Sequence, residues 1–257
     1  MIKLPISCFI IAKNESLRIE KTIKSVIDLV DEVIVIDSGS IDGTQKIASD
    51  LGCFVKTKEW NGYGLQKRFG EDACRNDWLL NLDADEYLTK DVAEEIVELF
   101  KNIRKYSFYS FKVTAIYHKW KKPRFLSSYH KCVRLYDKNI GRFSESAVHD
   151  SVITLNHKIK MIKNPIYHNS VMSYTHLINK QNSYIKLQAE TLKKRNISLL
   201  IIRLVIELPF SFFKYYIIRR HFTGGLSGFL TASIQSYFRW KRIVLFIVAY
   251  IRSKSLQ

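Results

Sequence analysis

The sequence predicts an α/β protein with a mostly parallel central sheet and flanking helices. Short apolar runs alternate with amphipathic segments through the first hundred residues, an order typical of doubly wound parallel sheets. Acidic and amide residues follow several of these runs, at the strand ends where α/β folds bind their ligands. Apolar residues make up 47% of the 257 residues, which is enough for a substantial core.

The elements of the first part are expected in a regular order. Strands are expected over residues 5–11, 32–37, 53–56 and 78–82. Helical periodicity predicts helices over 19–30, 44–52, 66–75 and 91–102. Asn14 is placed to cap the first of these helices. Aromatic and β-branched residues predict two further strands, over 107–117 and 131–136.

A pair of carboxylates follows the fourth expected strand. Asp83 and Asp85 are two positions apart, so on extended backbone their side chains project the same way. Adjacent carboxylates repel one another unless a cation or a shared proton intervenes. A divalent ion such as Mg²⁺ or Mn²⁺, carrying phosphate oxygens, would resolve the repulsion. A solvated acidic turn is the alternative interpretation. Asn14, Glu15 and Asp37 follow other strands, and we expect them at the same sheet edge, where they suit a nucleotide.

Other patterns exclude several classes of protein. There is no G-x-G-x-x-G after the first strand and no G-x-x-x-x-G-K-S/T, which argues against dinucleotide-dependent dehydrogenases and P-loop NTPases. The four cysteines form no C-x-x-C pair and are interpreted as small core residues of a reducing compartment. Residues 1–12 carry no secretory cleavage pattern, so no signal peptide is expected.

The charge is distributed unevenly along the chain. Residues 1–100 hold 12 Lys and Arg and 19 Asp and Glu, whereas residues 101–257 hold 29 and 5. This asymmetry suggests contact with a polyanion, either nucleic acid or an anionic membrane surface. We expect a catalytic domain over 1–175 and a basic, apolar helical tail over 176–257, which contains the apolar segments 198–218 and 243–251.

The tail has two interpretations. Charges and a proline interrupt segment 198–218, so it is a poor spanning helix. Apolar residues flanked by Lys and Arg favour helices that lie in a membrane interface. The alternative is a pair of core helices or a dimer contact. Oligomeric state stays open.

Three residues of the second part stand out as chemical candidates. Glu145 and Asp150 are two of only five acids there, and either could act as a general base. The alternative for both is a salt-bridged surface acid. His168 follows a short run after Pro165 and could supply a third metal ligand, although a lone histidine is often structural.

Several motifs taken together resemble family-two glycosyltransferases. They are Phe9-Ile10-Ile11-Ala12-Lys13-Asn14-Glu15, the stretch Val35-Ile36-Asp37-Ser38-Gly39-Ser40, and Leu82-Asp83-Ala84-Asp85-Glu86. A closer likeness is to lipopolysaccharide core glucosyltransferases of Gram-negative bacteria. It rests on Trp60-Asn61-Gly62-Tyr63-Gly64 with Gln66-Lys67, on Val148-His149-Asp150, and on Gly224-Gly225-Leu226-Ser227-Gly228.

The resemblance implies a GT-A fold and inverting transfer of a hexose from a nucleotide-diphosphate sugar, UDP-hexose by preference, to a glycolipid acceptor. It implies that Ala12, Asn14, Glu15 and Asp37 hold the nucleotide, that Asp83 contacts the ribose or the metal, and that Asp85 binds the metal. Asp150 stands where the subgroup usually has glutamate, so it is the expected base, with Glu145 as competitor. Lys67 and Arg134 are expected to contact the diphosphate or the acceptor.

The resemblance also implies a location, the cytoplasmic face of the inner membrane, with no nucleic-acid partner. Two alternatives stay open. A sugar-phosphate nucleotidyltransferase can share this sheet, although the glycine- and arginine-rich loop usual after its first strand is absent. A nucleic-acid-binding protein would use the basic half of the chain.

Overall fold

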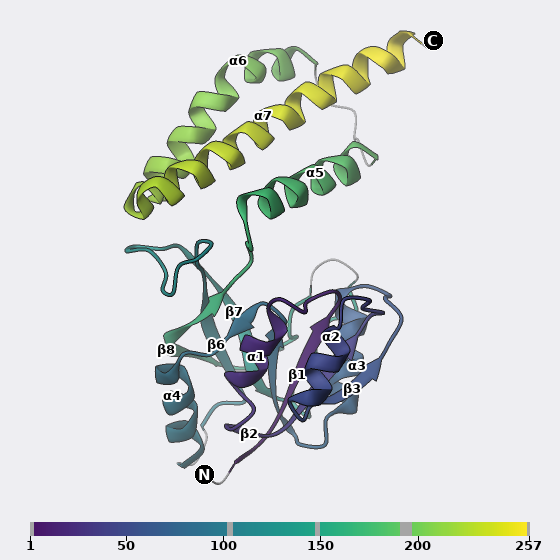
Figure 1. The fold of residues 1–257 in the computed structure, drawn as a ribbon, viewed down its shortest axis with the longest axis vertical. Helices are drawn as coiled ribbons and strands as arrows, with labels where there is room; N and C mark the ends of the chain where they lie inside the picture. Colours follow the sequence, from purple (N-terminus) through teal and green to yellow (C-terminus); the bar gives the residue numbers. More distant parts are fainter. Residues whose placement is uncertain (1–2, 102–104, 147–149, 191–196, 256–257) are drawn as a thin grey trace. The chain divides into compact units, whose positions relative to one another are not determined.

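The computed structural model describes residues 3–101, 105–146, 150–190 and 197–255 (Figure 1). Its contacts divide the chain into two compact units. The first unit joins Met1–Ala115 to Tyr129–Ser170, and it contains the whole sheet. The second unit joins the short segment Ile116–Ser128 to Val171–Gln257. The segment Ile116–Ser128 is therefore a loop that leaves the sheet and packs with the helices of the second unit.

The first unit begins with the strand–helix alternation that the sequence predicts. The strands are β1 (Leu4–Ala12), β2 (Val30–Asp37), β3 (Phe54–Thr57) and β4 (Trp78–Asp83). The helices between them are α1 (Ile19–Lys24), α2 (Thr44–Asp50) and α3 (Tyr63–Ala73). All adjacent pairs among these four strands are parallel. The predicted mostly parallel α/β architecture is confirmed.

The rest of the unit extends this sheet with mixed strands. It comprises β5 (Glu86–Tyr87), α4 (Lys90–Lys101), β6 (Phe108–Ala115), β7 (Tyr129–Asp137) and β8 (Ile159–His168). The strand order is β3-β2-β1-β4-β7-β6-β8-β5. β7 is antiparallel to both β4 and β6, whereas β6 and β8 are parallel. The sequence did not predict β8 as a strand, because Pro165 lies inside it and polar residues interrupt its apolar pattern.

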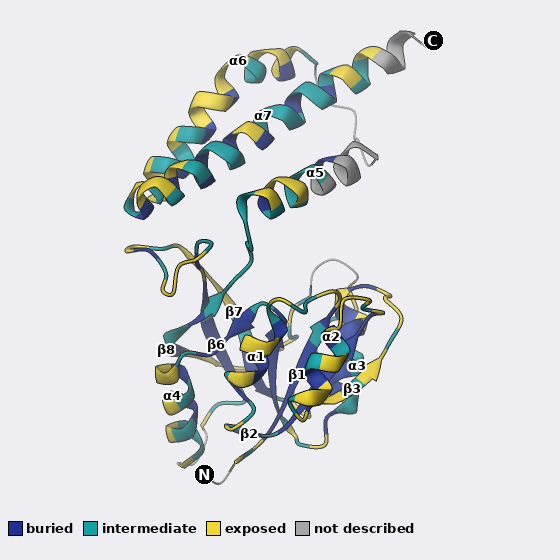
Figure 2. Ribbon diagram, in the orientation of Figure 1, coloured by how far each residue is buried: buried dark blue, intermediate teal, exposed yellow. Residues whose placement is uncertain are grey.

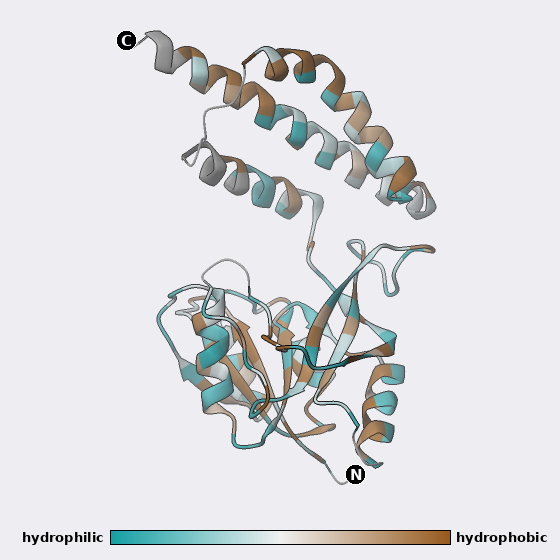
Figure 3. Cartoon of the chain, turned by 180° about the vertical axis from the view of Figure 1, so that it is seen from behind, coloured by the Kyte–Doolittle hydropathy of each residue, from teal (hydrophilic) through white to brown (hydrophobic). Residues whose placement is uncertain are grey.

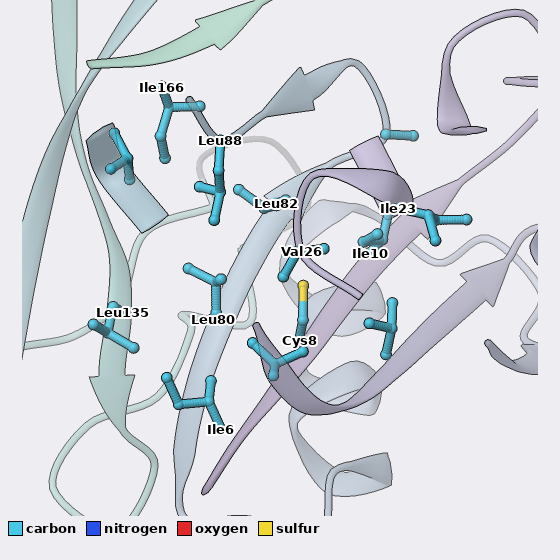
Figure 4. Close-up of a cluster of buried hydrophobic side chains, with 14 of the residues drawn as sticks. Ile6, Cys8, Ile10, Ile23, Val26, Leu80, Leu82, Leu88, Leu135 and Ile166 are labelled. Carbon is cyan, nitrogen blue, oxygen red and sulfur yellow. The ribbon is translucent and has the colours of Figure 1, made fainter. Parts of the chain in front are cut away.

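The main core lies between the sheet and the helices of the first unit. Figure 4 shows Ile6, Cys8 and Ile10 of β1 among side chains from β4, including Leu80 and Leu82. All five are fully buried. These central strands are covered on both faces, which explains their nearly continuous apolar runs. The four cysteines are free. Cys8, Cys53 and Cys74 are buried, which confirms their interpretation as small core residues, whereas Cys132 is only partly buried.

Two local expectations near the first helix are wrong. The helix α1 begins at Ile19 and its cap position is Arg18, so Asn14 does not cap it. Asn14 instead has a left-handed backbone with φ of 55° and lies in the preceding loop. The helix ends at Lys24, and Val30 opens β2 rather than continuing the helix. Apolar spacing persisted into the strand because both elements bury side chains against the same core.

The second unit is helical. It contains α5 (Tyr174–Glu190), α6 (Ile197–Phe213), a π-helical turn (Lys214–Ile218), a 3-10 turn (His221–Gly224) and α7 (Gly225–Ser255). Leu200 of α6 packs with Ile243 and Phe246 of α7. Among the described helices, none combines the length and apolarity needed to cross a bilayer.

The loop Ile116–Ser128 is tied to the turn between α6 and α7. Arg124 donates from Nη2 to the carbonyl oxygen of Arg219 at 2.6 Å. The Tyr117 hydroxyl lies 2.6 Å from Nδ1 of His221. A Cβ at Gly224 would meet the Tyr117 ring, so the glycine-rich stretch permits this close packing.

Candidate active site

The predicted nucleotide-binding residues lie at one edge of the sheet. β1 is flanked by β2 and β4, and its last residue Ala12 pairs with Asp37, while Ile11 pairs with Asp83. The carboxyl ends of the three parallel strands therefore lie side by side. Asp37 and Asp83 are on either side of β1 and are offset by one residue along it. The expected convergence at this edge is confirmed.

The loop after β2 is organised by Asp37. Its buried carboxylate accepts hydrogen bonds from the backbone N–H groups of Gly39 and Ser40 at 2.9 and 2.8 Å. Gln45 donates to it at 2.7 Å from α2. Gly39 has φ of 86°, a backbone conformation that favours glycine. Asp37 thus shapes the loop that borders the site.

The loop after β1 is joined to the loop after β2. The N–H of Asn14 donates to Ser40 Oγ at 2.8 Å, and Asn14 Oδ1 accepts from the N–H of Ile41 at 3.0 Å. The N–H of Glu15 donates to Thr44 Oγ1 at 2.8 Å. These bonds fix the two loops together next to Ala12, which makes a preformed wall at the sheet edge.

Asp83 lies between two cations. Lys67 of α3 places Nζ 2.9 Å from Oδ1, and Arg134 of β7 places Nη2 2.7 Å from Oδ2. Burial opposes the charge of Asp83, but the two cations outweigh it and hold the pKa of Asp83 well below its usual value. Arg134 also lies 2.6 Å from Glu86, whose side chain is buried. Burial raises the pKa of Glu86.

Asp85 has different partners from Asp83. It lies in the turn between β4 and β5, not on extended backbone, so the expectation that both side chains project alike from a strand is wrong. Its Oδ2 atom lies 3.1 Å from His168 Nε2 and 3.1 Å from Arg18 Nη1. Arg18 is held in turn by Glu15 at 2.6 Å.

Asp85 and His168 each shift the pKa of the other. Burial raises the pKa of Asp85, but the hydrogen bond from His168 and the nearby Arg18 lower it more. Burial lowers the pKa of His168, but Asp85, together with Glu86 and Asp83, raises it to a net increase. Each group therefore favours the charged form of the other.

The predicted metal ligands Asp83, Asp85 and His168 do not form a three-ligand cluster. Across the described parts of the chain, no group of three or more His, Cys, Asp or Glu side chains is arranged to hold a metal ion. Two of them lie side by side: a hydrogen bond joins Asp85 Oδ2 to His168 Nε2 at 3.1 Å, and the two could bind one divalent ion once the imidazole has lost its proton from Nε2.

The two candidate bases have different surroundings. Asp150 Oδ2 lies 2.5 Å from Lys67 Nζ, and the same ammonium contacts Asp83. Glu145 has a side chain that is 68% exposed and lies 3.6 Å from Arg68. The structure brings Asp150 into the charged cluster and leaves Glu145 at its margin. Val148 and His149, which precede Asp150 in the motif, lie outside the described residues.

The helix α3 holds the segment that leads to Asp150. The N–H of Gly64 donates to the carbonyl of Ser146 at 3.0 Å, and a Cβ at Gly64 would overlap this backbone. Buried Glu71 accepts from the N–H of Phe143 at 2.8 Å and from Arg142 Nε at 2.8 Å. The motif containing Gly64 and Lys67 thus positions both a cation and the loop that faces it.

Sequence reasoning missed two members of the site. Arg18 contacts Asp85, and Glu86 contacts Arg134, but neither was singled out. Glu86 directly follows the D-x-D motif, and that adjacency was the available signal. No local signal identifies Arg18, because its partner lies 67 residues further along the chain.

Comparison with known proteins places this arrangement in a class. The model of the family described as "Glycosyl transferase family 2" matches residues 7–163. The chain belongs to this family, and its fold is of the GT-A type. Membership supports glycosyl transfer over the two alternatives that the sequence left open.

Several relatives cover nearly the whole chain. An uncharacterized glycosyltransferase of Rickettsia felis is 40% identical over 98% of this chain and 92% of its own length. The lipopolysaccharide core biosynthesis glycosyltransferase LpsC of Rhizobium meliloti is 28% identical over 90% of this chain and 87% of its own. The relationship therefore extends through the helical unit as well as the sheet.

Some solved structures are similar to part of the chain. Glucosyl-3-phosphoglycerate synthase from Mycobacterium tuberculosis, in complex with Mn²⁺, UDP and glucosyl-3-phosphoglycerate, is 27% identical over 44% of each chain, with a TM-score of 0.35. This similarity is too low to transfer any detail of its ligand contacts.

Proposed function

We propose that this protein is an inverting hexosyltransferase that uses a nucleoside-diphosphate hexose, UDP-hexose by preference, and a lipid-linked glycan acceptor of the lipopolysaccharide-core type. One observation carries the proposal: Lys67 bridges Asp83 and Asp150. This bridge joins the acidic sheet edge to a separate carboxylate suited to accept a proton. The acceptor class is supported by the similarity to LpsC over most of the chain.

In the proposed site, the loops after β1 and β2 form the nucleotide wall. Ala12, Asn14 and Glu15 border it from one strand, and Asp37 fixes the neighbouring loop. Asp83 is assigned to the ribose side because both of its oxygens already face cations. Lys67 and Arg134 bring positive charge to the position where the diphosphate would lie.

The proposed metal site uses Asp85 and His168, with phosphate oxygens or water as the other ligands. The two side chains are adjacent, and to bind one ion the imidazole would lose its Nε2 proton and Asp85 Oδ2 would give up its contact with Arg18. A bound Mg²⁺ or Mn²⁺ would act as a Lewis acid toward the leaving diphosphate. Loss of this ion would leave Asp85 and His168 as a hydrogen-bonded pair.

The proposed reaction is a single displacement. The oxygen of the acceptor hydroxyl forms a bond to the anomeric carbon as the bond from that carbon to the diphosphate oxygen breaks. Asp150 accepts the hydroxyl proton, and the nucleoside diphosphate leaves with the electron pair. One displacement from the face opposite the leaving group inverts the anomeric configuration.

The donor is tested with a panel of nucleotide sugars and the full-length protein. With Mn²⁺ present, we expect one nucleoside-diphosphate hexose to raise the thermal unfolding temperature, since a ligand at 100 times its Kd adds about 2.7 kcal/mol to stability. Asp83→Asn should abolish this shift, whereas Asp91→Asn, at an exposed acid of α4, should not. A folded wild-type protein that no nucleotide sugar stabilises would contradict the proposal.

A further inference from the structure

The helix α6 has its polar side turned inward. Its buried residues include Glu207, which is 4% exposed. Glu207 lies 2.7 Å from Arg203 in the same helix and 2.8 Å from Arg239 of α7, and it accepts a hydrogen bond from Ser211 at 2.9 Å. The charged groups of α6 are thus paired against α7.

The outer face of α6 is apolar. We call it the α6 face, and it consists of Leu199, Ile201, Ile202, Val205, Ile206, Leu208, Phe210 and Phe213. These side chains are 43% to 76% exposed. At about 100° per residue they cover an arc of about 200°. Of the two charged residues of α6, Glu207 is buried, whereas Arg203 is half-buried and paired with it. Figure 2 shows α6 largely exposed, and Figure 3 shows the same helix largely hydrophobic.

This arrangement is the reverse of a helix packed on a water-soluble core. A surface helix normally turns its apolar stripe inward and its charges outward. Contiguous exposed apolar patches of this kind mark interaction sites. A helix whose outer face is covered by lipid, and not by water, carries apolar residues on that face and keeps its charges paired on the inner face.

The loop Ile116–Ser128 adds a second apolar surface beside the end of α6. Phe125 and Leu126 at its tip are 76% and 49% exposed. Thr223 Oγ1 donates to the carbonyl of Phe125 at 2.7 Å. This bond fixes the tip to the turn that follows α6, where Phe222 and Ile218 are also exposed.

The charge of this unit identifies the partner. Residues 116–128 hold four Lys and Arg and no acid, and residues 171–257 hold fourteen and two acids. One of these acids, Glu207, is already neutralised by two arginines. A second copy would bring the same excess of positive charge against it, whereas an anionic surface would attract it.

We propose that the α6 face and the tip of the loop Ile116–Ser128 dock on an anionic phospholipid bilayer. The apolar side chains enter the boundary between headgroups and acyl chains, with α6 lying along the surface. The exposed Lys119, Lys121 and Lys122 of the loop contact anionic headgroups. This docking is peripheral and would hold the enzyme where a lipid-linked acceptor is presented.

Vesicle flotation with the full-length protein tests the docking. We expect flotation with vesicles that mix phosphatidylglycerol and phosphatidylcholine, and little with phosphatidylcholine alone. The double variant Val205→Asp/Ile206→Asp should lower vesicle affinity about tenfold or more, because it places two charges in the apolar face. Phe125→Asp, in a different element, should weaken binding independently. Phe54→Asp, at a 58% exposed phenylalanine of β3 in the first unit, is the matched control and should float like wild type.

Two measurements separate this inference from the proposed function and from self-association. The double variant Val205→Asp/Ile206→Asp, here called the α6 variant, should keep the thermal shift given by the nucleotide sugar. This result would show that the fold and the donor site are intact. Sedimentation should give the same mass for wild type and variant. Wild-type protein that fails to float with the anionic vesicles would overturn the proposal. So would a wild-type dimer that the α6 variant converts to a monomer without any vesicle binding.

Discussion

Lys67 Nζ lies 2.5 Å from Asp150 Oδ2, at the centre of the site. The lysine comes from α3 and is buried, so the side chains packed around it fix its position. Because the same ammonium also faces Asp83, the carboxylate of Asp150 is held next to the sheet edge that would bind the donor.

This relationship predicts that Asp150 and not Glu145 is the base. Asp150→Asn should lower transfer by about 10²- to 10⁴-fold, the usual contribution of a general base. Donor binding should persist, as measured by the thermal shift with the nucleotide sugar. Glu145→Gln is the control and should keep most of the activity, because its side chain lies at the margin of the site. The reverse pattern would assign the base to Glu145.

Metal removal should abolish transfer. Chelation with EDTA should eliminate activity, and Mn²⁺ or Mg²⁺ should restore it. Asp85→Asn and His168→Gln should each prevent the extra thermal stabilisation that Mn²⁺ gives in the presence of the nucleotide sugar, because each removes one proposed ligand. Asp91→Asn, an exposed acid on α4, serves as control. Undiminished transfer after complete chelation would show that no metal is needed.

Glu71 should matter for stability far more than its neighbour Asp72. Glu71 is fully buried and accepts from Tyr136, Arg142 and the N–H of Phe143. Glu71→Gln should lower the free energy of unfolding by about 2–4 kcal/mol, because it leaves buried donors without a charged acceptor.

The control for this prediction is a second carboxylate that contacts the same arginine. Asp72 also pairs with Arg142, but its side chain is 63% exposed. Asp72→Asn should change the free energy of unfolding by less than about 1 kcal/mol. Denaturant titration measures both variants, and equal losses would contradict the role assigned to Glu71.

His221 should make the stability of the helical unit depend on pH. Burial, together with nearby Arg124 and Arg219, lowers the pKa of His221 to about 4. Burial raises the pKa of Tyr117 to about 12. At neutral pH the Tyr117 hydroxyl is therefore protonated and His221 is neutral, and a hydrogen bond joins the hydroxyl to Nδ1.

The sign of this dependence follows from the lowered pKa of His221. His221 takes up a proton near pH 6.5 in the unfolded chain but only near pH 4 in the folded chain. The free energy of unfolding therefore decreases as the pH is lowered through this window. With allowance for partial exposure, the loss between about pH 7 and about pH 5 should be about 1 kcal/mol. His221→Gln should flatten this part of the curve, whereas His157→Gln, at an exposed histidine, should not.

Local patterns were sufficient for the order of strands and helices from β1 to β4 and for the location of the acids at strand ends. Apolar periodicity depends on which face of an element is covered, and this held for β1 to β4. It failed where a neighbour changed the local preference. The cap expected at Asn14 was absent because that residue bonds the loop after β2. β8 was missed because Pro165 lies inside it and polar residues interrupt its apolar pattern.

The sequence by itself determined the sheet architecture and the identity of most acids at its edge, because both depend on residues close together along the chain. Only the tertiary structure decided which cations face those acids. Lys67 and Arg134 reach Asp83 from 16 and 51 residues away, and His168 reaches Asp85 from β8. The sequence likewise made α6 apolar, but packing against α7 decided that its charges point inward. Such pairings depend on how distant elements pack, and no local pattern records that.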